Sequence, residues 1–215
     1  VQWGSHNGYF GDYSPAMLKA FREFLTEKYQ NDNLLQKAWN RKDITLETVE
    51  IPTIQERVLD TGQGQIQDPQ TSQNVIDYLI CHSYVIVDSI SSLAKAIKDA
   101  LPQPRITLAF SGSYFASQSW LQHLSQNSGS LALDRLLDCS YIDALSSPSE
   151  YMYRSAGTGY GKFMTAEQSV AMRGKLWFGE NDIRTHLNTE SGFGTTHTVS
   201  DTICVQRRQF SAVLQ

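Results

Sequence analysis

The chain has 215 residues, 40% of them hydrophobic, with 18 Lys and Arg against 22 Asp and Glu for a net charge of −4. Its length and apolar content indicate one globular domain with a sizeable core and exclude disorder. The charge balance, without any run of Lys or Arg, argues against a nucleic-acid or anionic-membrane partner. Polar residues interrupt even the most apolar stretch, Ile76 to Ile97, so we expect a soluble protein. The compartment stays open, with the cytoplasm favoured.

The first part of the chain predicts helices. Ser14 followed by Pro15 is typical of a helix start, and apolar residues on one face extend this helix to about Tyr29. A short helical piece is expected at 34–39. An irregular stretch follows at 41–67, and excursions of this length usually carry function.

A long helix and then an alternating pattern make up the rest. Asp68-Pro69 predicts the start of a helix of about thirty residues, which Pro102 and Pro104 end. Short apolar strands then alternate with helices, which predicts a parallel sheet covered by helices and therefore an α/β fold. A capping box of Thr165 and Gln168 supports one helix start. The expected strands are 105–111, 141–145 and 175–178, and the expected helices are 117–137, 165–173 and 198–214.

These strands predict a partial (β/α)8 barrel. A complete barrel of this kind takes about 250 residues, whereas the chain shows three clear strands and the end of a fourth at 1–3. The sequence therefore predicts about half a barrel. No repeat and no composition break divides the chain, so residues 1–215 are expected to form a single partial domain.

Several motifs of other chemistries are incomplete. The glycine-rich run 157–163 lacks the glycine and the Ser or Thr of a phosphate loop, because Ala156 and Phe163 stand at those positions. The five histidines show no spacing suited to a metal, so a zinc enzyme is not expected. Cys81, Cys139 and Cys204 are far apart, and we interpret them as buried thiols.

The most informative segment surrounds Glu180. An apolar strand runs directly into this residue, which places a carboxylate at the carboxyl end of a parallel strand, where barrel enzymes keep their catalytic groups. Asn181, Asp182, Arg184 and His186 follow it. Charged residues after a strand also often serve only to cap a loop, so this segment alone leaves both roles open.

Polar and aromatic residues follow the other two strands as well. Carboxylates and rings together suit a carbohydrate, whose C–H faces stack on aromatic side chains while its hydroxyls bond to charged groups. Glycoside hydrolysis usually needs two carboxyls, so a single glutamate is half of a mechanism. The residues that follow the strands are Ser111, Gly112 and Tyr114, then Pro148, Glu150, Tyr151, Tyr153 and Arg154.

The run GKLWFGENDIRTHL resembles the nucleophile strand of glycoside hydrolase family 42 and related β-galactosidase-like enzymes, which are retaining enzymes of clan A built on a (β/α)8 barrel. The resemblance covers nearly the whole chain. Other segments agree with it in order: DYSPAMLKAFREFLTEKY, YIDALSSPSEYMYRSAG and RRQF.

The resemblance implies roles for particular residues. Glu180 matches the nucleophile at the end of the seventh strand, while the acid/base glutamate at the end of the fourth strand would precede Trp3-Gly4 and lie upstream of Val1. The eighth strand is not in the sequence either. We therefore expect an internal piece of a longer enzyme, from the end of strand 4 to helix 7, that is inactive by itself and self-associates through its exposed barrel edges.

Further residues are expected to bind the substrate or to line its pocket. Tyr151 resembles the tyrosine that often bonds to the nucleophile in this clan, although Tyr153 competes for that position. No metal and no cofactor are carried over from the family. The other pocket candidates, for which loop packing is the competing interpretation, are Trp3, Tyr114, Arg154, Asn181, Asp182 and Arg184.

The sequence is compatible with three functions. The first is a retaining glycosidase acting on β-galactosides through a covalent intermediate on Glu180. The second is a noncatalytic carbohydrate-binding or scaffolding protein with a degenerate glycosidase barrel. The third, a barrel enzyme for phosphorylated substrates, ranks last because no complete phosphate loop is found.

Overall fold

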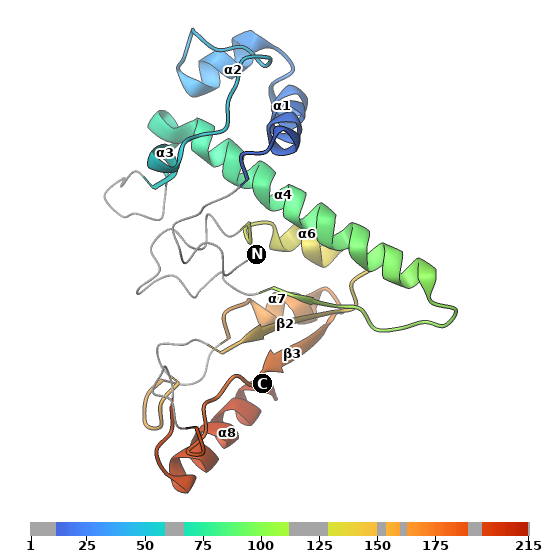
Figure 1. The fold of residues 1–215 in the computed structure, drawn as a ribbon, viewed down its shortest axis with the longest axis vertical. Helices are drawn as coiled ribbons and strands as arrows, with labels where there is room; N and C mark the ends of the chain where they lie inside the picture. Colours follow the sequence, from blue (N-terminus) through green and yellow to red (C-terminus); the bar gives the residue numbers. More distant parts are fainter. Residues whose placement is uncertain are drawn as a thin grey trace. The chain divides into compact units, whose positions relative to one another are not determined.

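A computed structural model describes residues 12–58, 67–111, 129–149, 154–159, 163–188 and 195–214. The chain divides into two compact units, Val1–Ile90 with Leu121–Arg135 and Ser91–Trp120 with Leu136–Gln215. Figure 1 labels most of the elements along the chain. In order they are α1 (Pro15–Tyr29), α2 (Asp32–Trp39), α3 (Ile54–Val58), α4 (Pro69–Ala100), β1 (Leu108–Phe110), α6 (Leu133–Asp138), β2 (Ala144–Pro148), α7 (Glu167–Met172), β3 (Leu176–Glu180) and α8 (Val199–Val213).

In the first unit, a side-chain N-cap marks the start of α1 and of α2. The Ser14 hydroxyl accepts a hydrogen bond from the Met17 N–H, and α1 ends at Gln30, whose φ of 65° is left-handed. This confirms the predicted first helix. Helix α2 begins two residues earlier than expected, because the Asn31 side chain caps it by accepting from the Leu34 N–H.

Helix α4 confirms the predicted long helix, with one irregularity. Ser72 has non-helical dihedral angles, so a kink interrupts the first turns. The apolar face of α4 supplies Val75, Tyr78 and Leu79 to a core that also contains Phe21 and Leu25 of α1. Burial of a large apolar side chain such as Phe21 or Leu25 contributes about 1.5–3 kcal/mol, so this core is the main source of stability in the first unit.

A buried carboxylate joins the three helices around this core. The side chain of Asp77 on α4 is fully buried and accepts four hydrogen bonds. They come from Lys28 Nζ (2.6 Å), Tyr29 Oη (2.6 Å), Trp39 Nε1 (2.8 Å) and Gln73 Nε2 (2.8 Å). Burial, together with the bond to Asp77, raises the pKa of Tyr29. Asp77 therefore fixes α1 and α2 against α4, and both of its carboxylate oxygens accept hydrogen bonds.

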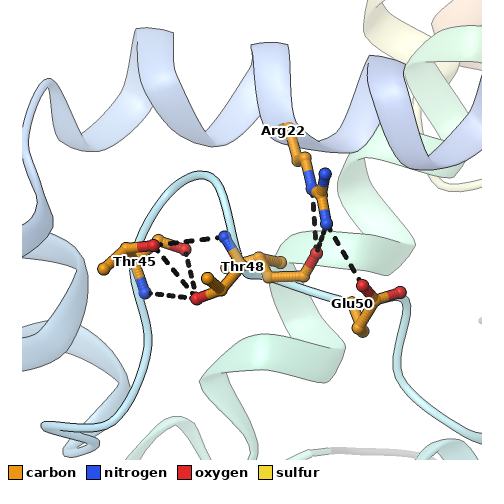
Figure 2. Close-up of polar contacts among 5 residues, drawn as sticks. Arg22, Thr45, Thr48 and Glu50 are labelled. Atoms are coloured by element: carbon orange, nitrogen blue, oxygen red, sulfur yellow. Dashed lines mark hydrogen bonds and ion pairs between the residues drawn. The ribbon is translucent and has the colours of Figure 1, made fainter.

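The segment after α2 is held to α1 by an arginine. Arg22 donates through Nε (3.0 Å) and Nη2 (2.8 Å) to the carbonyl of Val49, and Nη2 also contacts Glu50 (Figure 2). Thr45 and Thr48 close a turn just before it, with the Thr45 N–H donating to Thr48 Oγ1 at 2.9 Å. The expectation of an irregular 41–67 stretch is corrected at α3, where Thr53 and Glu56 exchange bonds that start a short helix.

The second unit contains a parallel sheet, as predicted, with strand order β1-β2-β3. Leu108 pairs with Ala144, and Ala144 with Leu176. The strand bounds differ from the prediction: β2 begins three residues later than expected, because Tyr141 lies in a turn. Strand β3 continues two residues further than expected, as far as Glu180.

Three other predictions are corrected or limited. Helix α7 has no side-chain cap, because the Thr165 hydroxyl donates to the carbonyl of Ser111 instead of closing a capping box with Gln168. Cys81 is buried, but Cys139 is half-buried and Cys204 is exposed on α8, whose buried positions are Val205 and Gln209. Of the helix expected at 117–137, residues 117–128 lie outside the described residues.

Within the described ranges, every helix is too short or too polar to cross a lipid bilayer.

Substitution of Asp77 tests the helix junction. Asp77→Asn retains the size of the side chain but leaves a single acceptor oxygen and turns an amide N–H₂ toward groups that donate, so we expect a loss of about 3 kcal/mol in the free energy of unfolding. Urea denaturation measures it. The matched control is Asp43→Asn, whose carboxylate pairs with Arg41 on the surface and should matter little. Equal stability of the two variants would contradict the role given to Asp77.

Candidate functional site

Glu180 lies at the carboxyl end of the sheet. It is the last residue of β3 and pairs with Pro148, the last residue of β2. Because the two strands are parallel, the segments that follow them meet at the same edge. The structure therefore confirms the predicted position of Glu180 at the end of a strand.

The two faces of β3 differ in what covers them. A Cβ on Gly179 would lie 3.0 Å from both the Phe163 ring and the Val213 side chain, so this face is covered closely and a larger residue would be tight there. Side chains alternate along a strand, so Glu180 belongs to the opposite face, with Leu176 and Phe178. Both of these apolar side chains are exposed. Glu180 thus ends an uncovered face of the strand.

Arg154 connects the segments that follow β2 and β3. Its side chain is 1% exposed. It donates through Nε (3.3 Å) and Nη2 (2.8 Å) to the carbonyl of Ser149, directly after β2. Its Nη1 binds Asp182 after β3, at the carbonyl and at carboxylate Oδ2 (3.0 Å). A planar guanidinium suits this double contact better than an ammonium would.

Opposing effects act on the protonation of Glu180. Burial is the largest and raises the pKa of its carboxyl above the ordinary value; the negative charge of Asp182 raises it further, while the charge of Arg154 lowers it. The net direction is upward. Since the charged form is disfavoured in the folded chain, the stability associated with this group is present at low pH and is lost as the pH rises through the folded pKa.

The structure brings some of the predicted site residues together. Glu180, Asp182 and Arg154 form one cluster at the edge of the sheet. Asn181 is exposed and donates to Gln206 of α8, while the carbonyl of Arg184 accepts the N–H of Thr196. Their substrate-binding roles stay predictions. Trp3, Tyr114 and Tyr151, with the competing Tyr153, lie outside the described residues.

One residue beside this cluster was missed. Arg208 of α8 donates to the carbonyls of Arg154 (2.6 Å), Ser155 (3.0 Å) and Thr158. The sequence contains the pair Arg207-Arg208 without showing which of them faces the sheet edge. The helical period offers a signal, because Arg208 stands three residues after the buried Val205, whereas Arg207 is exposed.

In the part of the chain that the structure describes, no three His, Cys, Asp or Glu side chains come together as a metal site would require.

Comparisons with known proteins bear on the fold. No protein-family model matches the sequence, and no curated protein matches it either. Among solved structures, the chain is similar to the crystal structure of the catalytic domain of β-amylase from Paenibacillus polymyxa, with a TM-score of 0.62 and 17% identity. The match covers 95% of this chain and 48% of that chain, so this chain spans about half the length of the domain it resembles.

At this identity the likeness shows the fold alone. It supports an α/β fold similar to that of the β-amylase catalytic domain, which agrees with the α/β fold expected from the sequence. It does not support family 42 in particular, nor a preference for β-galactosides.

Substitution of Asp182 tests the electrostatics of the cluster. In Asp182→Asn, the negative charge that raises the pKa of Glu180 is removed while the positive charge of Arg154 stays, so we expect that pKa to fall. A ¹³C NMR titration of the Glu180 carboxyl measures the change. Asp138→Asn is the control, since Asp138 is exposed and pairs with Arg173. An unchanged or higher pKa of Glu180 in Asp182→Asn would show that Asp182 does not act on it.

Proposed function

We propose that this chain is part of the catalytic barrel of a retaining, β-galactosidase-like glycoside hydrolase, with Glu180 as the nucleophile. In this proposal the chain covers the barrel from the end of strand 4 to helix 7. The observation that carries it is the position of Glu180, at the carboxyl end of a parallel strand in a fold similar to a glycoside hydrolase catalytic domain. Barrel enzymes place their catalytic groups at this end.

The reaction would proceed in two displacements. An oxygen of Glu180 forms a bond to the anomeric carbon while the glycosidic C–O bond breaks, and the leaving oxygen takes a proton from a second carboxyl. Water then attacks the anomeric carbon, the same second group removes its proton, and the bond to Glu180 breaks. Net retention results from the two inversions.

The second carboxyl has to come from a residue other than Asp182. Asp182 is only two positions from Glu180, and its Oδ2 already accepts a bond from Arg154. The sequence resemblance assigns this role to the glutamate expected before Trp3-Gly4. The two carboxyls of a retaining enzyme lie about 5–5.5 Å apart, so that strand would have to close against the uncovered face of β3.

An acid/base role for Glu180 is the second candidate. The raised pKa of its carboxyl favours it, because a proton donor must hold its proton near neutral pH. A nucleophile must instead be ionised in the resting enzyme. The experiment below separates the two roles, as well as the noncatalytic alternative.

Glu180→Gly in the complete gene product tests the proposal. Turnover of natural galactosides should fall by several orders of magnitude, because the covalent step is lost. Added azide should then attack an aryl galactoside with an activated leaving group from the side of the missing carboxylate. NMR of the product should show a glycosyl azide of configuration opposite to that of the substrate. Glu47→Gly, in an exposed turn, is the control and should remain active.

Each other outcome contradicts the nucleophile assignment in its own way. A glycosyl azide of retained configuration would assign Glu180 as the acid/base. Full activity of Glu180→Gly would make it a loop residue. A parent protein that binds sugar without any turnover would favour the noncatalytic alternative.

Self-association with a second copy remains a proposal from the sequence. The exposed side chains of Leu108 and Phe110 on β1, and of Leu176 and Phe178 on β3, favour it, because parallel sheets are normally covered on both faces. Light scattering over a range of micromolar concentrations measures it, and a monomer throughout would refute it.

A further inference from the structure

Arg208 is a cation beside the Glu180 cluster that the sequence did not predict there. It stands on α8, 28 residues beyond Glu180 at the end of β3, and its side chain is half-buried. Its two terminal nitrogens donate to three backbone carbonyls, those of Arg154, Ser155 and Thr158. Burial lowers the pKa of Arg208, although an arginine stays charged. A half-buried cation bound to carbonyls alone fixes the backbone that carries them.

The backbone that Arg208 holds is the one that presents Arg154. The carbonyl of Arg154 accepts from Arg208 at 2.6 Å, while the side chain of the same residue binds Ser149 and Asp182. The contacts therefore continue from α8 through the 154–159 loop to the segment after β3. Each step is a charged hydrogen bond, and such bonds are the stronger ones in proteins.

We propose that Arg208 is a positioning residue for Glu180, which holds the 154–159 loop so that Arg154 can fix Asp182 and the end of β3. It touches neither a substrate nor Glu180 and acts only through Arg154 and Asp182. The inference deepens the proposed function and rests on it, because the placement of Glu180 matters for catalysis only if Glu180 reacts. The placement itself can be measured without any reaction.

The side-chain chemistry indicates why arginine is needed here. The guanidinium is a planar fork that reaches several acceptors at once, whereas a lysine ammonium is a point charge at the end of a flexible chain. Lysine at 208 would keep the charge but would not hold three carbonyls in a fixed arrangement. The conservative substitution therefore separates geometry from charge.

The test compares Arg208→Met with Arg207→Met in the full chain. Both variants lose one positive charge from α8, but Arg207 is exposed. The readouts are the ¹³C NMR titration of Glu180 and amide hydrogen exchange of residues 154–159. Two charged residues act on Glu180, namely Asp182 and Arg154. Both residues are retained in both variants.

In Arg208→Met, we expect faster exchange in the loop. We also expect the pKa of Glu180 to fall toward the value of a solvated glutamate, since burial is the largest cause of its present shift. Arg207→Met should match the parent chain in both readouts. Arg208→Lys, which keeps the charge and is the safer variant for folding, should resemble Arg208→Met.

The proposal is overturned if folded Arg208→Met or Arg208→Lys keeps the parent pKa of Glu180 and the parent exchange rates. It is also overturned if Arg207→Met causes the same changes, since charge alone would then explain them. If the nucleophile assignment of Glu180 failed instead, the results of the two experiments would distinguish this case. In that case the pKa and exchange effects would remain, while the azide product of Glu180→Gly would show the wrong configuration or would not form.

Discussion

The parallel pairing of β2 with β3 is the constraint on which the rest of the site depends. It sets Pro148 opposite Glu180, so the segments after the two strands meet at one edge. Arg154 can reach both the Ser149 carbonyl and Asp182 only because of this register. A shift of one residue would turn Glu180 to the face that Phe163 and Val213 cover.

Two arginines with different partners organise this edge. Arg154 is buried and binds a carboxylate as well as carbonyls, whereas Arg208 binds carbonyls only. Among the described residues, the two terminal nitrogens of Arg208 are bonded to carbonyls, whereas its Nε is buried without a hydrogen-bond partner. Within the described part of the chain, the Glu180 carboxylate forms no direct ion pair, and burial has the largest effect on its protonation. The protonation of Glu180 thus depends on burial more than on any single partner.

The sequence predicted those features that local chemistry decides. Ser14-Pro15 predicted the start of α1, and the spacing of apolar residues predicted α4. The apolar strand that runs into Glu180 predicted the position of this residue at the edge of the sheet. Features that depend on distant contacts were not predictable. Thr165 appeared to begin a capping box, but its hydroxyl binds the carbonyl of Ser111, 54 residues away. Arg208 was missed for the same reason, because its partners lie about 50 residues earlier in the chain.

The central claim is that Glu180 forms a covalent bond to the sugar, and trapping of that intermediate tests it most directly. A 2-deoxy-2-fluoro-β-galactoside with a dinitrophenolate leaving group slows the second displacement more than the first, so the glycosyl-enzyme accumulates. The complete gene product would be incubated with this reagent, digested and examined by mass spectrometry. We expect a fluorosugar on the peptide that contains Glu180, bonded to that residue. A label on another carboxylate, or an active enzyme that takes up no label, would contradict it.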